Sequence, residues 1–345
     1  MNLIPPPESD PTTMEAVHAS VQQVHAGIAA MRAEIAGSVM GQSSVVDQVL
    51  CCVLADGHAL LEGVPGTGKT LLVRTIAAAT GLDMGRVQFT PDLMPADITG
   101  TTVMAESASG RRASIFRPGP IFHGLLLADE INRASPRTQS ALLEAMEERR
   151  VTVAGRTHPL PEPFIVLATQ NPNEQEGTHR LPEAQIDRFM MKIIVPPPQA
   201  QTLERIIGST TGTAVYEPQR CISPEFLCAA TRLSRRILLA PHVNDWIAAL
   251  VIGTGDTAIG GDVPDLLIAP CSPRAAIAVR RTSQVAALTA GRLAVSCADV
   301  RAVLPSCLRH RMSVSPAAKG RNLTPDDLVD MLLEAVPSPA EEVMN

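Results

Sequence analysis

The chain has 345 residues, of which 45% are hydrophobic and only 2% aromatic, and its formal net charge is −6. The acidic balance argues against a strongly basic duplex-binding face, and the scarcity of aromatic rings argues against a stacking platform for single-stranded nucleic acid. The start lacks a basic and then apolar leader, and no apolar run approaches about 18 residues, so we expect no membrane span and a cytoplasmic location. Seven cysteines without a CxxC pair predict buried free thiols rather than disulfides or a zinc site.

The first two hundred residues read as an α/β unit. Residues 1–13 are rich in proline and polar side chains, so we expect a flexible N-terminus. Apolar residues spaced three or four apart predict helices over 14–36 and 44–56. Strands and helices then alternate, which favours a parallel sheet covered by helices. The predicted strands span 58–62, 86–90, 124–128, 164–169 and 190–195.

The first of these strands leads into a glycine-rich loop with the sequence GVPGTGKT, which matches the phosphate-binding pattern GxxxxGK[ST]. Backbone N–H groups of such a loop wrap a phosphate, and the helix that follows points its positive end at it. Lys69 supplies a charge to the β- and γ-phosphates, and Thr70 supplies a hydroxyl for Mg²⁺. The loop therefore predicts a nucleoside triphosphate such as ATP, bound with Mg²⁺. The residues that we assign to it are Gly63, Pro65, Gly66, Thr67, Gly68, Lys69, Thr70 and Leu71.

Two later strands end in polar residues that suit hydrolysis. The apolar run at 125–128 is followed by Asp129 and Glu130, at the edge where parallel sheets bind ligands. We expect Asp129 to join the Mg²⁺ shell, and Glu130 to orient and polarise the attacking water. Asn171 follows the next strand and can bond both the γ-phosphate and the water, although Asn-Pro also commonly starts a turn.

The rest of the chain is predominantly helical. Ser135 as N-cap and Pro136 at the first position predict a helix over 136–148, and a hairpin is expected near 151–160. The three prolines at 196–198 form the best domain boundary. We expect 253–271 to be a long loop, because it is rich in glycine and proline, and 337–345 to be frayed. Helices are predicted over 199–208, 224–236, 242–252, 273–291, 297–305 and 325–335.

Long blocks of the sequence resemble the MoxR family of AAA+ ATPases, nearly without a gap from residue 35 to about residue 195. The matching blocks are QFTPDLMPADITG at 88–100, RPGPIF at 117–122, ADEINRA at 128–134, LLEAM at 142–146, ATQNP at 168–172 and LPEAQIDRF at 181–189. The resemblance implies a three-layer αβα P-loop core over 14–198 and a smaller C-terminal helical lid over 199–336.

The resemblance also implies roles for particular residues. Asn171 would be the sensor 1 residue, and Arg188 the arginine finger that reaches the γ-phosphate of a neighbouring subunit. Arg274, in the segment Ser-Pro-Arg-Ala, would be the sensor 2 residue and a second γ-phosphate contact. Gly41, in the segment 39–42, would pass near the adenine.

Two segments resemble insertions of the family, and two segments depart from its pattern. Residues 97–116 resemble the helix 2 insertion and 151–160 the pre-sensor 1 insertion, and both would face the pore of a ring or its client. His179-Arg180 stands where the family usually has Tyr-Pro, so Arg180 could compete with Arg188 as the contact in trans. The stretch 251–271, before the sensor 2 segment, also departs from the family's pattern.

As a whole, the resemblance implies Mg²⁺-dependent ATP hydrolysis by a ring, which we expect to be a homo-hexamer. Hydrolysis would drive chaperone-like remodelling, maturation or metal-cofactor insertion of a partner, often a protein with a von Willebrand factor A domain. The alternatives are a nucleic-acid motor, a metal-chelatase ATPase subunit, or a nucleotide-gated scaffold with little turnover. The acidic balance argues against nucleic acid, and Glu130, Asn171 and Arg188 argue against a scaffold.

Overall fold

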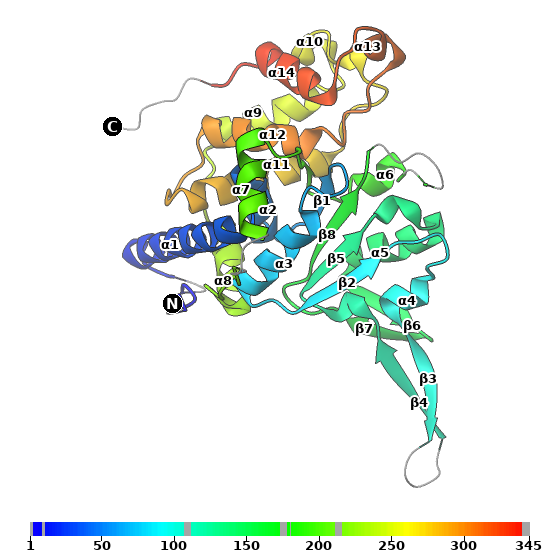
Figure 1. Cartoon of the computed structure of the whole chain (residues 1–345). Helices are drawn as coiled ribbons and strands as arrows, with labels where there is room; N and C mark the ends of the chain where they lie inside the picture. Colours follow the sequence, from blue (N-terminus) through cyan, green and yellow to red (C-terminus); the bar gives the residue numbers. More distant parts are fainter. Residues whose placement is uncertain are drawn as a thin grey trace.

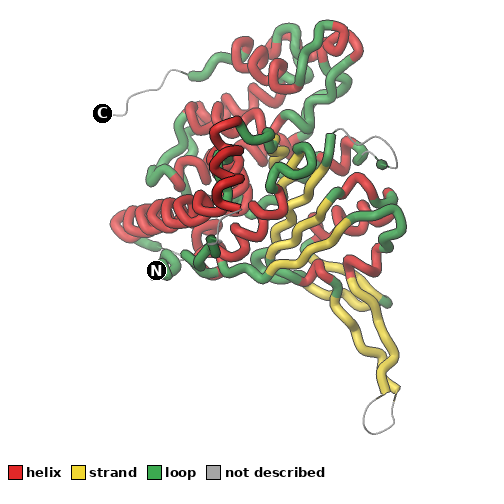
Figure 2. The backbone as a smooth tube through the Cα atoms, in the orientation of Figure 1, coloured by secondary structure: helices red, strands yellow, loops and turns green. Residues whose placement is uncertain are grey.

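The computed structural model describes residues 3–8, 11–106, 112–172, 178–179, 181–210 and 216–339. In that part of the chain, five parallel strands form the central sheet, and helices pack against it (Figures 1 and 2). In spatial order they are β2 (Met84–Gln88), β5 (Leu125–Asp129), β8 (Ile165–Gln170), β1 (Ala59–Glu62) and β9 (Met191–Ile194). All five strands predicted from the sequence are present, and their bounds differ from the prediction by no more than two residues.

Alternate residues of the strands face two different helical layers. Leu61, Leu127 and Leu167 pack into a core shared with the layer of α1, α2 and α3. Leu60 and Leu126, one position away, pack into a second core with the helix that follows β5. Because side chains alternate along a strand, both faces of the sheet are buried and the αβα arrangement follows. The helices concerned are α1 (Met14–Ser38), α2 (Ser43–Leu54), α3 (Lys69–Thr80) and α5 (Pro136–Glu148).

Two antiparallel hairpins leave the body on one side. The longer, β3 (Gly100–Glu106) with β4 (Arg112–Pro118), follows the short helix α4 (Pro95–Thr99) and projects away from the sheet (Figure 1). The shorter pairs β6 (Arg150–Val153) with β7 (Arg156–Pro159), so the hairpin predicted near 151–160 is present. Their bases touch, because the rings of Phe116 and His158 stack with centroids 3.9 Å apart.

The C-terminal part of the described chain is helical, as predicted. The expected long loop at 253–271 is the exception, since it contains a short helix, α10, and a 3-10 turn, η3. Asp256 caps α10 by accepting a hydrogen bond from the N–H of Ala258 at 2.9 Å, and Pro264 is the first residue of η3. The glycine and proline residues here therefore mark the ends of short helical turns. No described helix is both long and apolar enough to cross a membrane. The elements are α7 (Ala200–Thr210), α8 (Pro224–Ser234), α9 (Pro241–Ile252), α10 (Thr257–Gly260), η3 (Pro264–Leu266), α11 (Pro273–Thr289), α12 (Cys297–Leu308), α13 (Pro316–Gly320) and α14 (Pro325–Ala335).

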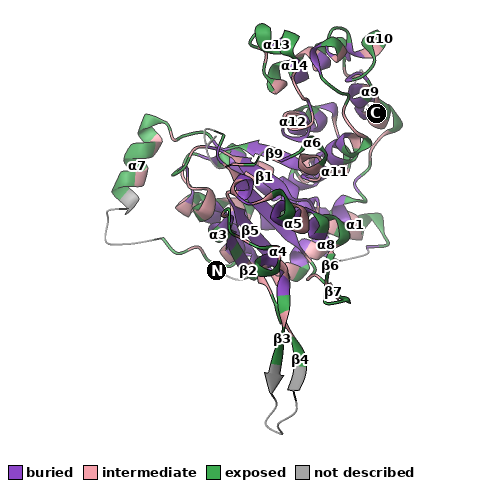
Figure 3. Cartoon of the chain, turned by 90° about the vertical axis from the view of Figure 1, so that its right-hand side faces the viewer, coloured by how far each residue is buried: buried purple, intermediate pink, exposed green. Residues whose placement is uncertain are grey.

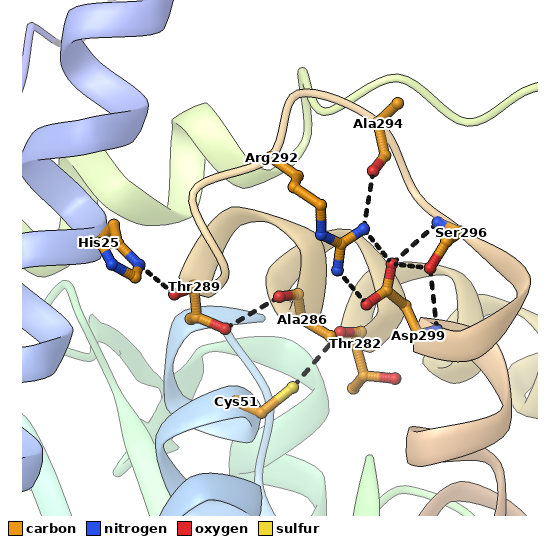
Figure 4. A network of polar contacts seen from close by, with 9 residues as sticks. All are labelled: His25, Cys51, Thr282, Ala286, Thr289, Arg292, Ala294, Ser296 and Asp299. Atoms are coloured by element: carbon orange, nitrogen blue, oxygen red, sulfur yellow. Dashed lines mark hydrogen bonds and ion pairs between the residues drawn. The ribbon is translucent and has the colours of Figure 1, made fainter. Parts of the chain in front are cut away.

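Helix α11 is tied to the N-terminal helices by polar contacts at its C-terminal half (Figure 4). His25 Nδ1 of α1 lies 2.7 Å from the carbonyl oxygen of Thr289, and the thiol of Cys51 in α2 donates to the carbonyl of Thr282 at 3.3 Å. Figure 3 shows the centre of the molecule as largely buried, whereas much of the described part of the β3–β4 hairpin is exposed. The lid therefore has a fixed attachment to the core.

Candidate functional site

A hollow of about 430 Å³ lies at the carboxyl ends of the central strands, which we call the phosphate hollow. It is formed by the loop after β1 and by the ends of β2, β5 and β8. The structure thus brings together the glycine-rich loop, the two carboxylates and Asn171, as the sequence predicts. The hollow is lined by Pro65, Gly66, Thr67, Gly68, Lys69, Thr70, Arg86, Gln88, Asp129, Glu130, Thr169, Gln170 and Asn171.

The loop has a backbone that only glycine adopts easily. Gly66 and Gly68 have φ of +81° and +83°, and no described atom lies within 4 Å of where a Cβ would stand. Gly63 is needed for a different reason, because its Cβ would lie 2.5 Å from the carbonyl oxygen of Val195. Helix α3 begins at Lys69, directly after Gly68, so its N-terminal N–H groups open into the hollow. An anion is therefore the ligand that this loop favours.

The last residue of β5, Asp129, and the residue that follows it, Glu130, both bond the same hydroxyl. Thr169, at the end of β8, donates to Asp129 Oδ1 at 2.6 Å and accepts from the N–H of Glu130 at 2.9 Å. Glu130 has a φ of +57°, a conformation that is unfavourable by about 1–2 kcal/mol for a residue with a Cβ. Its Oε2 accepts from Gln88 at 3.0 Å and from Arg133 at 2.8 Å. The Glu130 carboxylate is thus fixed at the edge of the hollow.

Sequence reasoning assigned no role to Arg86, Gln88 or Thr169. Arg86 lies 2.9 Å from Asp129 Oδ2, and its neighbour Gln88 bonds Glu130. The signal that could have found them is the register, because Gln88 pairs with Asp129 in the parallel sheet. Alternate residues at the end of β2 then lie beside the carboxylates that end β5.

The segment predicted to lie near the adenine borders a second space, the side hollow, of about 200 Å³. Gln42 donates to the carbonyl of Thr67 at 2.8 Å, which ties this segment to the loop. Gly41 packs against Thr202 of α7, where a Cβ would lie 2.6 Å from the hydroxyl oxygen. The side hollow and the phosphate hollow share three loop residues, so one elongated ligand could occupy both. The side hollow is lined by Ser38, Val39, Met40, Gln42, Gly66, Thr67, Gly68, Leu71, Pro198 and Ile206.

The donors in the phosphate hollow fit Mg²⁺. Thr70 and Asp129 both line it and offer the oxygen ligands that this ion prefers. Within the described residues, no group of three or more His, Cys, Asp or Glu side chains is arranged to hold a metal. A site with few protein ligands suits an ion that is bound together with substrate phosphates.

Arg188 and Arg274 lie elsewhere, in a hollow of about 320 Å³ that we call the arginine hollow. Neither is among the described residues that line the phosphate hollow. Gly57 and His58, which precede β1, also line the arginine hollow, so it lies at the amino end of that strand. Arg180, the alternative contact in trans, falls outside the described residues. The arginine hollow is lined by Asp56, Gly57, His58, Met146, Glu147, Arg149, Asp187, Arg188, Met190, Arg274, Ile277, Ala278, Arg281 and Arg311.

Residues of the lid hold the chain on both sides of Arg188. Ser272, the N-cap of α11, donates to Asp187 Oδ2 at 2.8 Å, and Arg311 Nε contacts Oδ1 of the same carboxylate at 2.7 Å. The side chain of Arg311 is only 3% exposed, and it also donates to the carbonyls of Asp187 and Phe189. The position of Arg188 therefore depends on contacts from the lid.

Comparison with known proteins matches two parts of the chain to family models. Residues 58–191 match the family model described as the ATPase family associated with various cellular activities (AAA), and residues 267–332 match the AAA lid domain. Chaperone MoxR1 of Mycobacterium tuberculosis is 37% identical, over 97% of this chain and 87% of its own. Protein MoxR of Paracoccus denitrificans is 33% identical, over 93% of this chain and 99% of its own. The crystal structure of a proposed ATPase from Cytophaga hutchinsonii superposes with a TM-score of 0.87 at 33% identity and covers 94% of this chain and 99% of its own.

Proposed function

This chain belongs to the MoxR family of AAA+ ATPases and is an ATPase, and we propose that it works as a homo-hexameric ring in the cytoplasm. Mg²⁺-dependent ATP hydrolysis in that ring drives chaperone-like remodelling, maturation or metal-cofactor insertion of a client protein. The relative named Chaperone MoxR1 supports the chaperone-like part of this proposal. The proposed division of the chain is an ATPase core over 14–198 and a lid over 199–336.

In the proposed complex, the nucleotide lies along the phosphate hollow and the side hollow of one subunit. The glycine-rich loop and the N-terminus of α3 cradle the phosphates, Lys69 adds a charge, and Gly41 and its neighbours border the adenine. Thr70 and Asp129 would hold Mg²⁺, which would neutralise charge on the phosphates. The other proposed contacts are Gly63, Pro65, Gly66, Thr67, Gly68 and Leu71.

Glu130 orients the attacking water and accepts its proton. Both of its side-chain hydrogen bonds with described residues go to Oε2, which leaves Oε1 for the water. Asn171, buried in the same hollow, bonds the water and the γ-phosphate. This pairing of a carboxylate with an amide suits proton transfer at a fixed position.

The observation that best supports the proposed ring is the position of Arg188 and Arg274 outside the phosphate hollow. Gly57 and His58, which line the arginine hollow, precede β1, whereas the phosphate-binding loop follows it. A four-residue strand spans about 13 Å at roughly 3.3 Å per residue, so the arginine hollow and the phosphate-binding loop of the same subunit lie at opposite ends of β1. A neighbouring subunit in a ring would bring its nucleotide to the arginine hollow, and both arginines would then stabilise charge on the γ-phosphate.

The client is proposed to contact the two hairpins. Val103, Met104 and Ile115 of the β3–β4 hairpin are 38%, 68% and 51% exposed, which suits contact with a protein. We propose a protein with a von Willebrand factor A domain as the client class. The Glu130→Gln variant should retain such a client in co-purification from the native cell. Substitution of Met104 and Ile115 in that variant should abolish this co-purification.

Native mass spectrometry tests the ring directly. The Glu130→Gln variant with ATP and Mg²⁺ should give the mass of six chains. A monomer under these conditions, at micromolar protein, would contradict the proposal.

A further inference from the structure

We infer that Glu147 is a positioning residue for hydrolysis, which holds Arg188 and Arg274 as one pair for the nucleotide of the neighbouring subunit. This inference rests on the proposed function in trans of those two arginines. It concerns a residue in the last turn of α5 that is not among the described residues lining the phosphate hollow.

The geometry is that of one carboxylate shared by two guanidinium groups. Arg188 Nη2 lies 3.1 Å from Glu147 Oε2, and Arg274 Nη2 donates to Glu147 Oε1. Arg188 comes from the core, between α6 (Glu183–Ile186) and β9, whereas Arg274 comes from the first turn of α11 in the lid. Glu147 therefore joins arginines from the two parts of the chain into one unit.

Of the acids among the described lining residues of the arginine hollow, Glu147 is the one that can pair with Arg188 and Arg274, because the other two are engaged elsewhere. Among the described lining residues, five are arginines and three are acids. Asp56 is engaged by Arg149 at 3.1 Å and by Arg235 at 3.3 Å. The second acid, Asp187, is held by Arg311 and Ser272 from the lid. Without Glu147, two like charges would face each other with no carboxylate between them, and we expect them to separate.

The contact leaves the arginines able to bind phosphate. Each uses one terminal nitrogen on Glu147, whereas a guanidinium has five N–H donors. The pair is thus oriented by Glu147 and keeps donors for a γ-phosphate, so this contact orients the pair rather than blocks it.

The contribution of Glu147 to folding should be small. Its side chain is 39% exposed, and ion pairs of such exposure contribute about 0–1 kcal/mol to stability. Substitution should therefore act on the rate and leave the fold intact.

Glu147→Gln tests the inference, with Glu148→Gln as the matched control. Glu148 is the next residue of α5, and the control breaks its exposed pair with Arg150; neither residue is among the described residues that line the arginine hollow. We expect Glu147→Gln to lower kcat about 10- to 100-fold, as misplacement of a positioned group does, with KM, melting temperature and ring mass unchanged. Glu148→Gln should keep the parental kcat.

Mixed rings distinguish positioning in trans from a local defect. Glu147→Gln subunits keep a whole phosphate-binding loop, and Lys69→Ala subunits keep the arginines and Glu147. Mixing the two should restore activity above the sum of the separate rates. A parental or raised kcat for Glu147→Gln, or a loss that comes with a lowered melting temperature or a broken ring, overturns the inference.

Failure of this inference and failure of the proposed function give different results. If Arg188→Ala keeps the parental kcat, the proposed function in trans fails. If Arg188→Ala is impaired and Glu147→Gln is not, only the role of Glu147 fails.

Discussion

The ammonium group of Lys69 donates a 2.6 Å hydrogen bond to the carbonyl of Gly63, the first residue of its own loop. A second bond, at 2.9 Å, goes to the carbonyl of Val64. Burial lowers the pKa of Lys69, while the nearby carboxylates of Asp129 and Glu130 oppose that shift. Lys69 therefore closes the loop, and a phosphate would offer it a charged acceptor in place of neutral carbonyls.

Lys69→Ala removes both the loop contact and the charge that faces the phosphates. ATP binding should weaken and hydrolysis should vanish, which titration with a fluorescent nucleotide and a phosphate-release assay would measure. Arg74→Ala, an exposed basic residue on the same helix, is the matched control and should behave like the parent. Unchanged affinity and rate in Lys69→Ala would mean that the loop does not bind the nucleotide.

Glu130→Gln should separate binding from hydrolysis. The amide keeps the size of the side chain and can still accept from Arg133, but it cannot take the proton of the water. ATP should bind and persist while the rate falls by at least about 100-fold, as single-turnover experiments would show. Hydrolysis at the parental rate would remove Glu130 from the role of base.

Asp129→Asn tests the metal site. The substitution keeps an oxygen near Thr169 but removes the negative charge that would face Mg²⁺ and Arg86. The Mg²⁺ concentration for half-maximal hydrolysis should rise by at least about tenfold. A Mg²⁺ titration that matches the parent would exclude Asp129 as a ligand.

Much of the fold could be predicted because local chemistry marks it. Most of the central strands are short and mainly apolar runs between turn residues, although β2 also carries Arg86 and Gln88. The helix at 136–148 begins where predicted, since the Ser135 side chain accepts from the N–H of Thr138. The short helical turns within 253–271 could not be predicted, because they depend on the Asp256 cap and on one proline in a glycine-rich stretch.

The site residues at the carboxyl ends of strands could be predicted from the sequence. Those brought together by the packing of the lid on the core, or by strand register, could not. The loop, Asp129, Glu130 and Asn171 each follow a strand of one parallel sheet, so they must meet at one edge. The meeting of Arg188 with Arg274 depends on how the lid packs on the core, which no spacing encodes. Arg86 and Gln88 required the register of β2 against β5.

Two buried histidines predict a loss of stability in mild acid. Burial and the nearby Arg149 lower the pKa of His58 to about 3, and burial and Arg311 lower the pKa of His310 well below its usual range. His58 Nδ1 accepts from the N–H of Val166 at 3.0 Å, a bond that protonation of that nitrogen would break.

Because the unfolded chain binds these protons near pH 6.5 and the folded chain does not, stability is full above that pH and falls as the pH drops below it. Below that pH, each histidine should lower the free energy of unfolding by about 1.4 kcal/mol for each unit that the pH falls. Denaturant titrations between pH 7 and 5 would measure this slope, and His58→Asn, which cannot be protonated, should flatten it. Equal slopes in parent and variant would contradict the assignment.

The central claim is that each ATP site is completed by Arg188 of a neighbour. Arg188→Ala should leave nucleotide affinity nearly intact and lower kcat by about 100-fold or more, since the contact forms mainly in the transition state. The decisive measurement is the ATPase rate of rings mixed from Arg188→Ala and Lys69→Ala subunits, each inactive alone. A Lys69→Ala subunit still has Arg188, which can contact the nucleotide of a neighbouring Arg188→Ala subunit whose phosphate-binding loop is unchanged. ATPase activity should therefore return as the subunits exchange. Rings that demonstrably mix and stay inactive would contradict the account.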